Sequence, residues 1–243
     1  MWHNKKMKDE LSKHGFTLAE VLITLGIIGV VAALTIPNLL ADQRKAQYIV
    51  GMKKAYSIWS QALLQMSVDA GTPGDLSSFF TSSSNLTMGN KIVPYFKILK
   101  NCDTTQRGCW ADSNAQNFDS SDYSANYDTP GVWYKFATID GMLVEIANSS
   151  QGCVGSQGTL TKMCANNVNI DVNGLTGPNT MGRDIFAFAI INDNGPAIYP
   201  WGAQRLLYWK TSHDCDYGYA GGTNKFGQYC PGRIIDDGWQ MTY

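Results

Sequence analysis

The stretch Gly15-Phe16-Thr17-Leu18-Ala19-Glu20 opens an apolar run that continues to residue 36. From Leu18 to Leu34 every residue is apolar or small except Glu20 and Thr24. A helix that spans a bilayer needs about 20 residues of this kind, and residues 16–36 supply 21. We therefore predict a transmembrane helix over residues 16–37.

Glu20 is the only formally charged residue between Phe16 and Asp42. A charged side chain in hydrocarbon is costly, and it becomes a functional candidate when a partner can be named. If the chain is cut between Gly15 and Phe16, the new α-amino group of Phe16 lies four residues before Glu20, on the same helix face. The two charges could then pair within one chain or between neighbouring chains. The alternative is that Glu20 lies at headgroup level and reaches the water.

The sequence Gly15-Phe16-Thr17-Leu18-Ala19-Glu20-Val21-Leu22, the Gly-Ile-Ile-Gly-Val-Val run from Gly26 and the following Pro37 closely resemble the N-terminus of type IV pilins and type II secretion pseudopilins. The resemblance covers about residues 13–60, and Ala19 stands where many members have isoleucine. It implies that a prepilin peptidase cuts after Gly15 and methylates Phe16, and that Glu20 sets the register of subunits in a helical filament. The implied partners are other pilin-like subunits, the prepilin peptidase, an inner-membrane assembly platform and membrane lipid.

Together these features divide the chain into four predicted segments. Residues 1–15 form a basic cytoplasmic leader, residues 16–37 the transmembrane helix, residues 38–70 the amphipathic half of the same helix, and residues 71–243 an exported, β-rich globular domain. Without the leader the chain has 15 Lys and Arg against 18 Asp and Glu. That balance gives no reason to expect nucleic-acid binding.

Beyond Pro37 the apolar residues recur at spacings of three and four, which is typical of a helix with one buried face. This predicted apolar stripe consists of Ile49, Met52, Tyr56, Trp59, Leu63 and Met66. The helix is expected to run from residue 16 to about residue 66, with a kink or local melting at Pro37, because proline lacks a backbone N–H.

The rest of the chain is predicted to contain antiparallel strands. Apolar runs at 131–137 and 142–147 are joined by Asp140-Gly141, and a second pair lies at 185–191 and 197–199, so both pairs predict hairpins. Residues 75–90 are expected to form a loop with a short helical turn, and residues 91–100 alternate between apolar and polar. We expect an α+β fold in which the long N-terminal helix packs on an antiparallel sheet, and the resemblance implies a similar pilin-like fold.

Six cysteines lie beyond the apolar segment. An even number in an exported region rich in Gly, Asn and Ser indicates disulfides. The close spacings favour sequential pairing among the 15 possible arrangements, namely Cys102–Cys109, Cys153–Cys164 and Cys215–Cys230. The alternative is a zinc site, but no CxxC occurs and the chain after residue 15 has one histidine, His213. The first pair falls in residues 101–126, a polar stretch that we expect to be surface loop.

The predicted location is the bacterial inner membrane, crossed once. Lysines and arginines are balanced across the apolar run, with Lys5, Lys6, Lys8 and Lys13 before it and Arg44, Lys45, Lys53 and Lys54 after it. The positive-inside rule therefore gives no orientation. The cysteines and the cleavage motif place the leader in the cytoplasm and the C-terminal domain in the periplasm or outside the cell.

One further motif has the composition of a cation site. Asn169-Ile170-Asp171-Val172-Asn173-Gly174 places oxygen-bearing side chains at alternate positions before a glycine, as in the first half of an EF-hand loop. Where that loop needs a glutamate the chain has Thr180, although Asp184 lies nearby. In major pseudopilins a calcium ion orders a C-terminal loop, so Asn169, Asp171, Asn173 and Asp184 are candidate calcium ligands. The alternative is a polar turn, and no other cofactor is expected.

Enzyme signatures are missing, and we predict a structural subunit. No nucleotide-binding or hydrolase motif occurs, and His213 lies two residues before Cys215, which is assigned to a disulfide. The favoured function is a pseudopilin or minor pilin of a type II secretion or type IV pilus-like filament. One alternative is an adhesin, or a DNA- or sugar-binding tip, on the same helix, and another is an anchored domain that never polymerises. The aromatic tail could form a sugar- or protein-binding patch, but core packing is favoured. This tail comprises Trp201, Tyr208, Trp209, Tyr217, Tyr219, Tyr229, Trp239 and Tyr243.

Overall fold

The computed structural model describes residues 15–80, 84–111, 115–121, 128–148, 153–155, 162–193, 195–202, 215 and 226–243. The chain forms two compact units, one ending at Arg44 and the other beginning at Lys45. The four predicted segment limits stay predictions.

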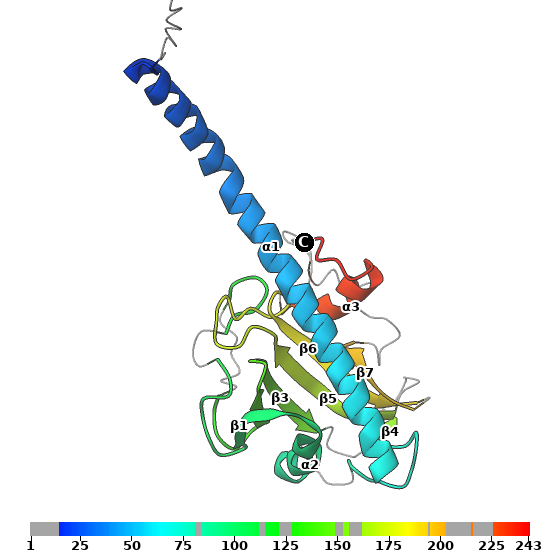
Figure 1. Cartoon of the computed structure of the whole chain (residues 1–243). Coiled ribbons are helices and arrows are strands. Elements are labelled where there is room, and N and C mark those ends of the chain that lie inside the picture. Colours follow the sequence, from blue (N-terminus) through cyan, green and yellow to red (C-terminus); the bar gives the residue numbers. More distant parts are fainter. Residues whose placement is uncertain are drawn as a thin grey trace, which may run out of the picture. The chain divides into compact units, whose positions relative to one another are not determined.

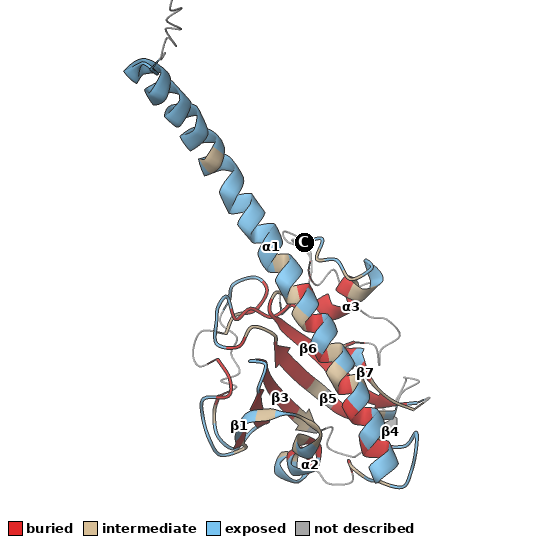
Figure 2. Cartoon of the chain, in the orientation of Figure 1, coloured by how far each residue is buried: buried red, intermediate tan, exposed pale blue. Residues whose placement is uncertain are grey.

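The first unit contains the beginning of α1 (Leu18–Asp69), a helix of 52 residues that continues through Pro37. The predicted long helix is therefore confirmed, with its end three residues later than expected and with no melted segment at the proline. Side chains of the apolar run are exposed along almost its whole length (Figure 2). In the described part of the chain, α1 is the one helix that is long and apolar enough to cross a bilayer.

The second unit is built on a seven-stranded antiparallel sheet in the order β1-β2-β3-β5-β6-β7, with β4 paired to β5 (Figure 1). Two helices and a 3₁₀ turn complete it. The strands are β1 (Ile98–Asp103), β2 (Tyr134–Thr138), β3 (Leu143–Asn148), β4 (Val154–Gly155), β5 (Lys162–Asp171), β6 (Ile185–Asn192) and β7 (Pro196–Pro200). The other elements are α2 (Asn85–Ile92), η1 (Val93–Tyr95) and α3 (Cys230–Asp236).

Both predicted hairpins are present, as β2–β3 and β6–β7. Two local predictions were wrong. Residues 85–92 form α2 rather than a loop, and its start is capped by the Ser84 side chain, which accepts a hydrogen bond from the Thr87 N–H. The alternation over residues 91–100 spans the end of α2, η1 and the start of β1. Helix capping residues such as Ser84 were the available signal.

The second half of α1 packs on one face of the sheet (Figure 1). Ile49, Met52, Trp59, Leu63 and Met66 are buried there, as the predicted apolar stripe requires, while Tyr56 is half-buried. The Trp59 ring contacts Phe96 at a centroid distance of 4.7 Å, and Phe96 contacts Phe136 of β2 at 5.4 Å. Full burial of one large apolar side chain stabilises a fold by about 1.5–3 kcal/mol, so this stripe fixes α1 on the sheet.

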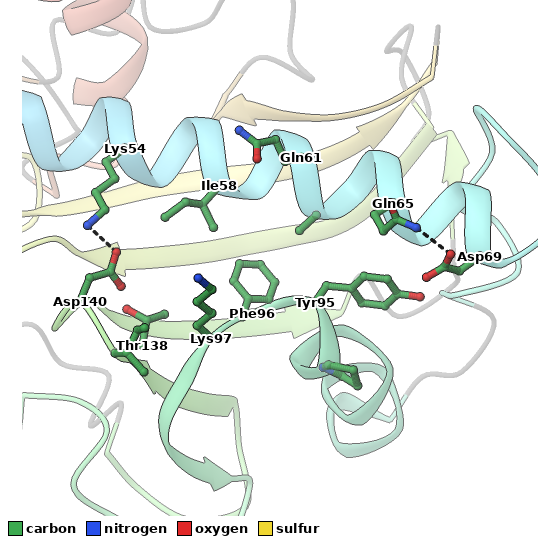
Figure 3. Close-up of a pocket in the computed structure, with 13 residues that line it drawn as sticks. Lys54, Ile58, Gln61, Gln65, Asp69, Tyr95, Phe96, Lys97, Thr138 and Asp140 are labelled. Atoms are coloured by element: carbon green, nitrogen blue, oxygen red, sulfur yellow. Dashed lines mark hydrogen bonds and ion pairs between the residues drawn. The ribbon is translucent and has the colours of Figure 1, made fainter.

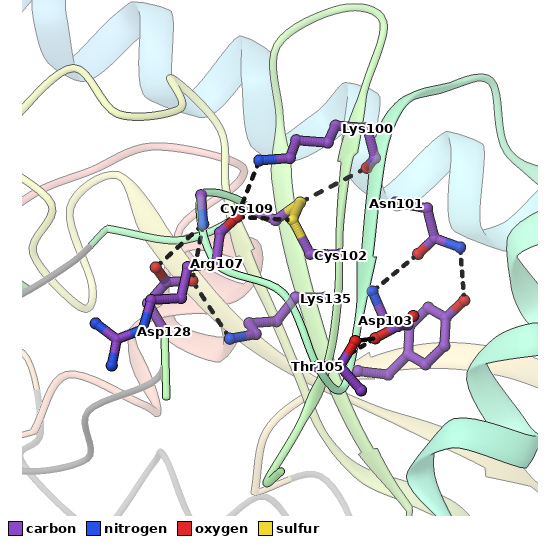
Figure 4. The surroundings of a disulfide bond; sticks show 11 residues. Lys100, Asn101, Cys102, Asp103, Thr105, Arg107, Cys109, Asp128 and Lys135 are labelled. Carbon is purple, nitrogen blue, oxygen red and sulfur yellow. Dashed lines mark hydrogen bonds and ion pairs between the residues drawn. A yellow bond between two sulfur atoms is a disulfide. The ribbon is translucent and has the colours of Figure 1, made fainter. Parts of the chain in front are cut away.

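Three disulfides join the predicted sequential pairs, Cys102–Cys109, Cys153–Cys164 and Cys215–Cys230. Cys102 lies in β1 rather than in a surface loop, and both cysteines of the first pair are fully buried. The loop that this bridge closes is also held by polar contacts (Figure 4). The Lys100 ammonium donates to the Arg107 carbonyl at 2.9 Å, and the Gly108 N–H donates to Asp128 Oδ2 at 3.1 Å. The first disulfide is therefore one of several ties between β1 and its loop.

The sheet face opposite α1 carries a buried polar row. Lys135, Glu145 and Asn169 are opposite one another on β2, β3 and β5, and each is at most 1% exposed. Lys135 forms an ion pair with the buried Asp128 at 3.3 Å. The Asn169 amide donates to Glu145 Oε1 at 2.7 Å, whereas Glu145 Oε2 and Asn169 Oδ1 have no hydrogen-bond partner. One proton on the Glu145 carboxyl would supply the missing donor for this acid–amide pair.

Burial raises the pKa of Glu145 well above its ordinary value, although the Asn169 amide and Lys135 oppose the shift. A carboxyl group whose pKa is raised by folding stabilises the fold relatively at low pH, and this contribution is lost as the pH rises through the folded-state pKa. We therefore expect Glu145→Gln, which mimics the protonated acid, to match the wild type near pH 4.5. At pH 7.5 it should be more stable by about 1–3 kcal/mol. Thermal unfolding of the full chain in detergent at several pH values measures this.

The matched control is Glu145→Ala, which leaves a cavity and should be less stable than the wild type at every pH. A Glu145→Gln variant that is destabilised equally at pH 4.5 and pH 7.5 would contradict the prediction. That result would mean that the ionised carboxylate is stabilised by Lys135.

Candidate assembly site

Of the predicted site residues, Gly15 and Phe16 lie just before α1 and Glu20 lies within it, all in the first unit. Thr17 immediately precedes the helix, and Glu20 lies in its first turn. The Thr17 N–H and hydroxyl both donate to Glu20 Oε2 at 2.8 Å, and the Thr17 hydroxyl oxygen accepts from the Glu20 N–H at 3.2 Å. This reciprocal arrangement is a capping box, in which two side chains satisfy backbone donors at a helix start.

Sequence reasoning assigned Glu20 to charge pairing and missed this second role. The signal was the spacing Thr17-x-x-Glu20 before an apolar run, which is the sequence pattern of a capping box. The box fixes the carboxylate at the N-terminal end of α1, where the helix dipole favours negative charge. Both contacts from Thr17 go to Oε2, so Oε1 makes no hydrogen bond in the described part of the chain. Glu20 can therefore cap the start of α1 through Oε2 and leave Oε1 for a second interaction.

Residues 11–36 match the family described as the prokaryotic N-terminal methylation motif. The chain carries the leader signature of type IV pilins and pseudopilins. No curated protein and no solved structure matches the chain. The pilin-like motif points to a structural subunit. It implies processing by prepilin peptidase and assembly with other pilin subunits, and with the apolar helix it supports a membrane-anchored protein.

The candidate calcium ligands are only partly brought together. Asp171 ends β5 and Asp184 directly precedes β6, so both carboxylates lie at the turn between these strands, with Asn173 beside them. Asn169 lies on β5, and its amide binds Glu145. The alternation that resembled an EF-hand loop is here partly the alternation of a strand, in which Val168 and Ile170 face the core under α1.

A groove of about 970 Å³ lies in the second unit between the second half of α1 and the ends of β1 and β2 (Figure 3). The Lys54 ammonium forms an ion pair with Asp140 Oδ2 at 2.6 Å, and the Gln65 amide donates to Asp69 at 2.7 Å. The Lys54–Asp140 pair joins α1 to the residue after Ile139, and the Gln65–Asp69 pair lies along α1. Phe96 and Ile58 contribute its apolar wall.

The described aromatic residues of the tail pack against other aromatic rings, but only Tyr229 is buried, whereas Trp201, Trp239 and Tyr243 are half-buried. Trp201 contacts Tyr229 at a centroid distance of 4.9 Å, and Trp239 contacts Tyr56 of α1 at 5.7 Å. Tyr243 packs on Phe118 at 5.3 Å. The remaining tail aromatics, and His213, lie outside the described residues. They are Tyr208, Trp209, Tyr217 and Tyr219.

The capping box gives a local prediction for the helix start. Thr17→Val keeps the side-chain shape but removes the hydroxyl that exchanges hydrogen bonds with Glu20. We expect the first-turn amides of α1 to exchange with solvent about fivefold faster, because loss of an N-cap oxygen costs about 1 kcal/mol. Hydrogen exchange followed by mass spectrometry, on the full chain in detergent micelles, measures this.

Thr24→Val is the matched control, since Thr24 donates only to the Val21 carbonyl within the helix. It should leave exchange at the helix start unchanged. Equal exchange in Thr17→Val and wild type would show that the box does not stabilise the first turn.

Proposed function

We propose that this chain is a pseudopilin or minor pilin, a filament subunit of a type II secretion or type IV pilus-like machine. In this proposal the chain crosses the inner membrane once with its C-terminal domain outside the cytoplasm, and the leader is removed after Gly15. The observation that carries the proposal is the position of Glu20. It is the only charge in residues 16–41, and it stands at the start of an apolar helix beside the cut that would create a second charge.

In the proposed mechanism, helices of neighbouring subunits replace the lipid around the apolar helix during assembly. Before assembly, lipid covers the exposed apolar side chains of the first unit. In the filament, neighbouring helices replace the lipid, and the Phe16 α-ammonium of one subunit pairs with Glu20 of the next. The pair would lie at low dielectric, where the attraction is stronger than in water but desolvation offsets much of it. The pair is therefore expected to set register more than to add stability.

A second candidate function is a ligand-binding tip subunit with the same helix. The feature that favours it is the groove beside α1 in the second unit, which has a mixed polar and apolar lining. Binding of a sugar or DNA ligand to the full chain, lost on substitution of groove residues such as Lys97, would support the tip role. A third candidate, an anchored domain that never polymerises, is distinguished by processing and assembly.

The first prediction of the proposal is that the mature chain begins at Phe16. Mass spectrometry of protein from membranes that contain an active prepilin peptidase should find this N-terminus, with one added methyl group. Gly15→Ala should still be cut, whereas a bulky residue at position 15 should block cutting. An intact Met1 in such membranes would refute the assignment.

The second prediction separates the charge of Glu20 from its capping role. Glutamine also serves in a capping box, so Glu20→Gln should keep the helix start, membrane insertion and cleavage. Filament incorporation should fall at least tenfold, because the attraction to a neighbouring α-ammonium is lost. The measurement follows epitope-tagged Glu20→Gln through cleaved protein, membrane fraction and sheared filament.

Thr17→Val provides the control, since it disturbs the capping box but keeps the charge. It should assemble better than Glu20→Gln. Normal incorporation of Glu20→Gln, followed through its own tag in the presence of wild-type subunits, would rule out the pairing role.

A further inference from the structure

A lysine and an aspartate meet in the interior of the second unit, on the sheet face opposite α1. The Lys135 ammonium lies 3.3 Å from Asp128 Oδ1, and the two side chains are 0% and 4% exposed (Figure 4). Lys135 belongs to β2, whereas Asp128 precedes that strand. The pair therefore ties the chain before β2 to the strand itself, away from bulk water.

The two buried charges are poorly compensated. Loss of hydration offsets most of the attraction in a buried ion pair. An ammonium group has three donors, and in the described part of the chain Lys135 uses one of them, toward Asp128. A primary amine and a carboxyl group in contact can also condense to a neutral amide. Condensation would remove both charges from the interior.

The Asp128 carboxyl group is oriented for such a reaction. The Gly108 N–H donates to Oδ2 at 3.1 Å and to Oδ1 at 3.3 Å, so one backbone dipole points at both oxygens. An N–H in this position stabilises the negative charge that develops on oxygen when a nucleophile attacks the carboxyl carbon. Well-oriented groups within one molecule reach effective concentrations of about 10⁵–10⁸ M. The fixed contact thus replaces the high concentration that condensation needs in solution.

A second buried acid lies next to the pair and can carry protons. Glu145 is fully buried and stands directly opposite Lys135 in the register of β2 and β3. Its Oε1 accepts from the Asn169 amide, whereas Oε2 has no hydrogen-bond partner. Burial raises the pKa of Glu145 well above its ordinary value, so this carboxyl group can exchange a proton with its neighbours instead of staying ionised.

We propose that Lys135 and Asp128 condense to an intramolecular isopeptide bond, with Glu145 as the proton carrier. The Lys135 ammonium first gives one proton to the Asp128 carboxylate. The neutral Nζ then attacks Cγ of Asp128 and forms the Cγ–Nζ bond. Glu145 accepts a second proton from the nitrogen and returns one to the leaving hydroxyl group, which departs as water when the Cγ–O bond breaks. Glu145 ends as it began, and the reaction consumes no other reagent.

The competing arrangement is an ion pair that stays ionic. It uses the same contact between Lys135 and Asp128, and it keeps both charges in the interior. The two arrangements have different covalent masses, because the isopeptide bond costs the chain one water molecule. They also differ toward trypsin, which cuts after a free lysine but not after one whose amine is in an amide bond.

The test is peptide mapping of the full chain, purified in detergent, reduced, alkylated and digested with trypsin. If the bond forms, cutting after Lys135 fails. A single peptide that covers residues 108–162 should then appear, lighter than its sequence mass by one water. Fragment ions should place the missing water between Asp128 and Lys135.

The chain contains a matched internal control. Lys54 and Asp140 are closer, at 2.6 Å, but their side chains are 50% and 24% exposed. Water hydrates both groups and competes for the carboxyl carbon, so this pair should stay ionic. Trypsin should cut after Lys54, and the peptides that carry Lys54 and Asp140 should have their full mass.

Two variants separate the reacting group from the proton carrier. Lys135→Arg keeps a cation but has no primary amine, so it should show full mass. Glu145→Gln should slow bond formation at least tenfold, measured as the linked fraction against time after synthesis, because it cannot carry a proton. The bond would itself affect stability, so thermal unfolding of Glu145 variants is compared on the Lys135→Arg background, where no bond can form.

Separate wild-type peptides of residues 108–135 and 136–162 at full mass would overturn the proposal and leave a permanent ion pair. The same loss of water in Lys135→Arg would overturn it too, because the water would then come from another group. Bond formation at the wild-type rate in Glu145→Gln would refute the proton carrier. None of these measurements depends on leader cleavage or filament assembly, so they are independent of the proposed function.

Discussion

The burial of one stripe of α1 against the sheet is the constraint on which the second unit depends. Met52, Trp59, Leu63 and Met66 are at most 1% exposed, and they cover the strand residues that face them. Successive residues of a strand point to opposite faces, so this packing also decides which residues turn away from the helix. The opposite face is covered by loops instead, and the disulfide Cys102–Cys109 ties one of them to β1.

Buried polar groups are concentrated on the sheet face opposite α1, because this face is covered by loops. A face covered by loops lies close to backbone N–H and carbonyl groups, which can satisfy buried side chains. Asp128 uses the Gly108 N–H, and Asp184 uses two N–H groups of its own turn. Glu145 is less well served, because its Oε2 atom has no hydrogen-bond donor. A proton on the Glu145 carboxyl would supply the donor that this face does not provide.

Much of this fold could be predicted because its signals are local. The spacing of apolar residues identifies α1, Asp140-Gly141 identifies the β2–β3 hairpin, and short cysteine separations favour the sequential disulfides. The central strand β5 was not predicted, because its Asn residues suggest a loop and its pairing with β3 joins distant segments. The burial of Glu145 was not predicted either, because it depends on the pairing of β3 with strands on both sides. No short stretch of sequence encodes these contacts.

The assembly site shows the opposite case, in which a local signal was present but was interpreted in one way only. Glu20 was assigned from its charge, and the capping box shows that its side chain is already positioned by Thr17 in an isolated subunit. A long side chain normally loses conformational entropy when it forms an ion pair. Here most of that loss has occurred before a neighbour arrives. The carboxylate is thus preorganised, and an incoming ammonium group meets a fixed target rather than a mobile one.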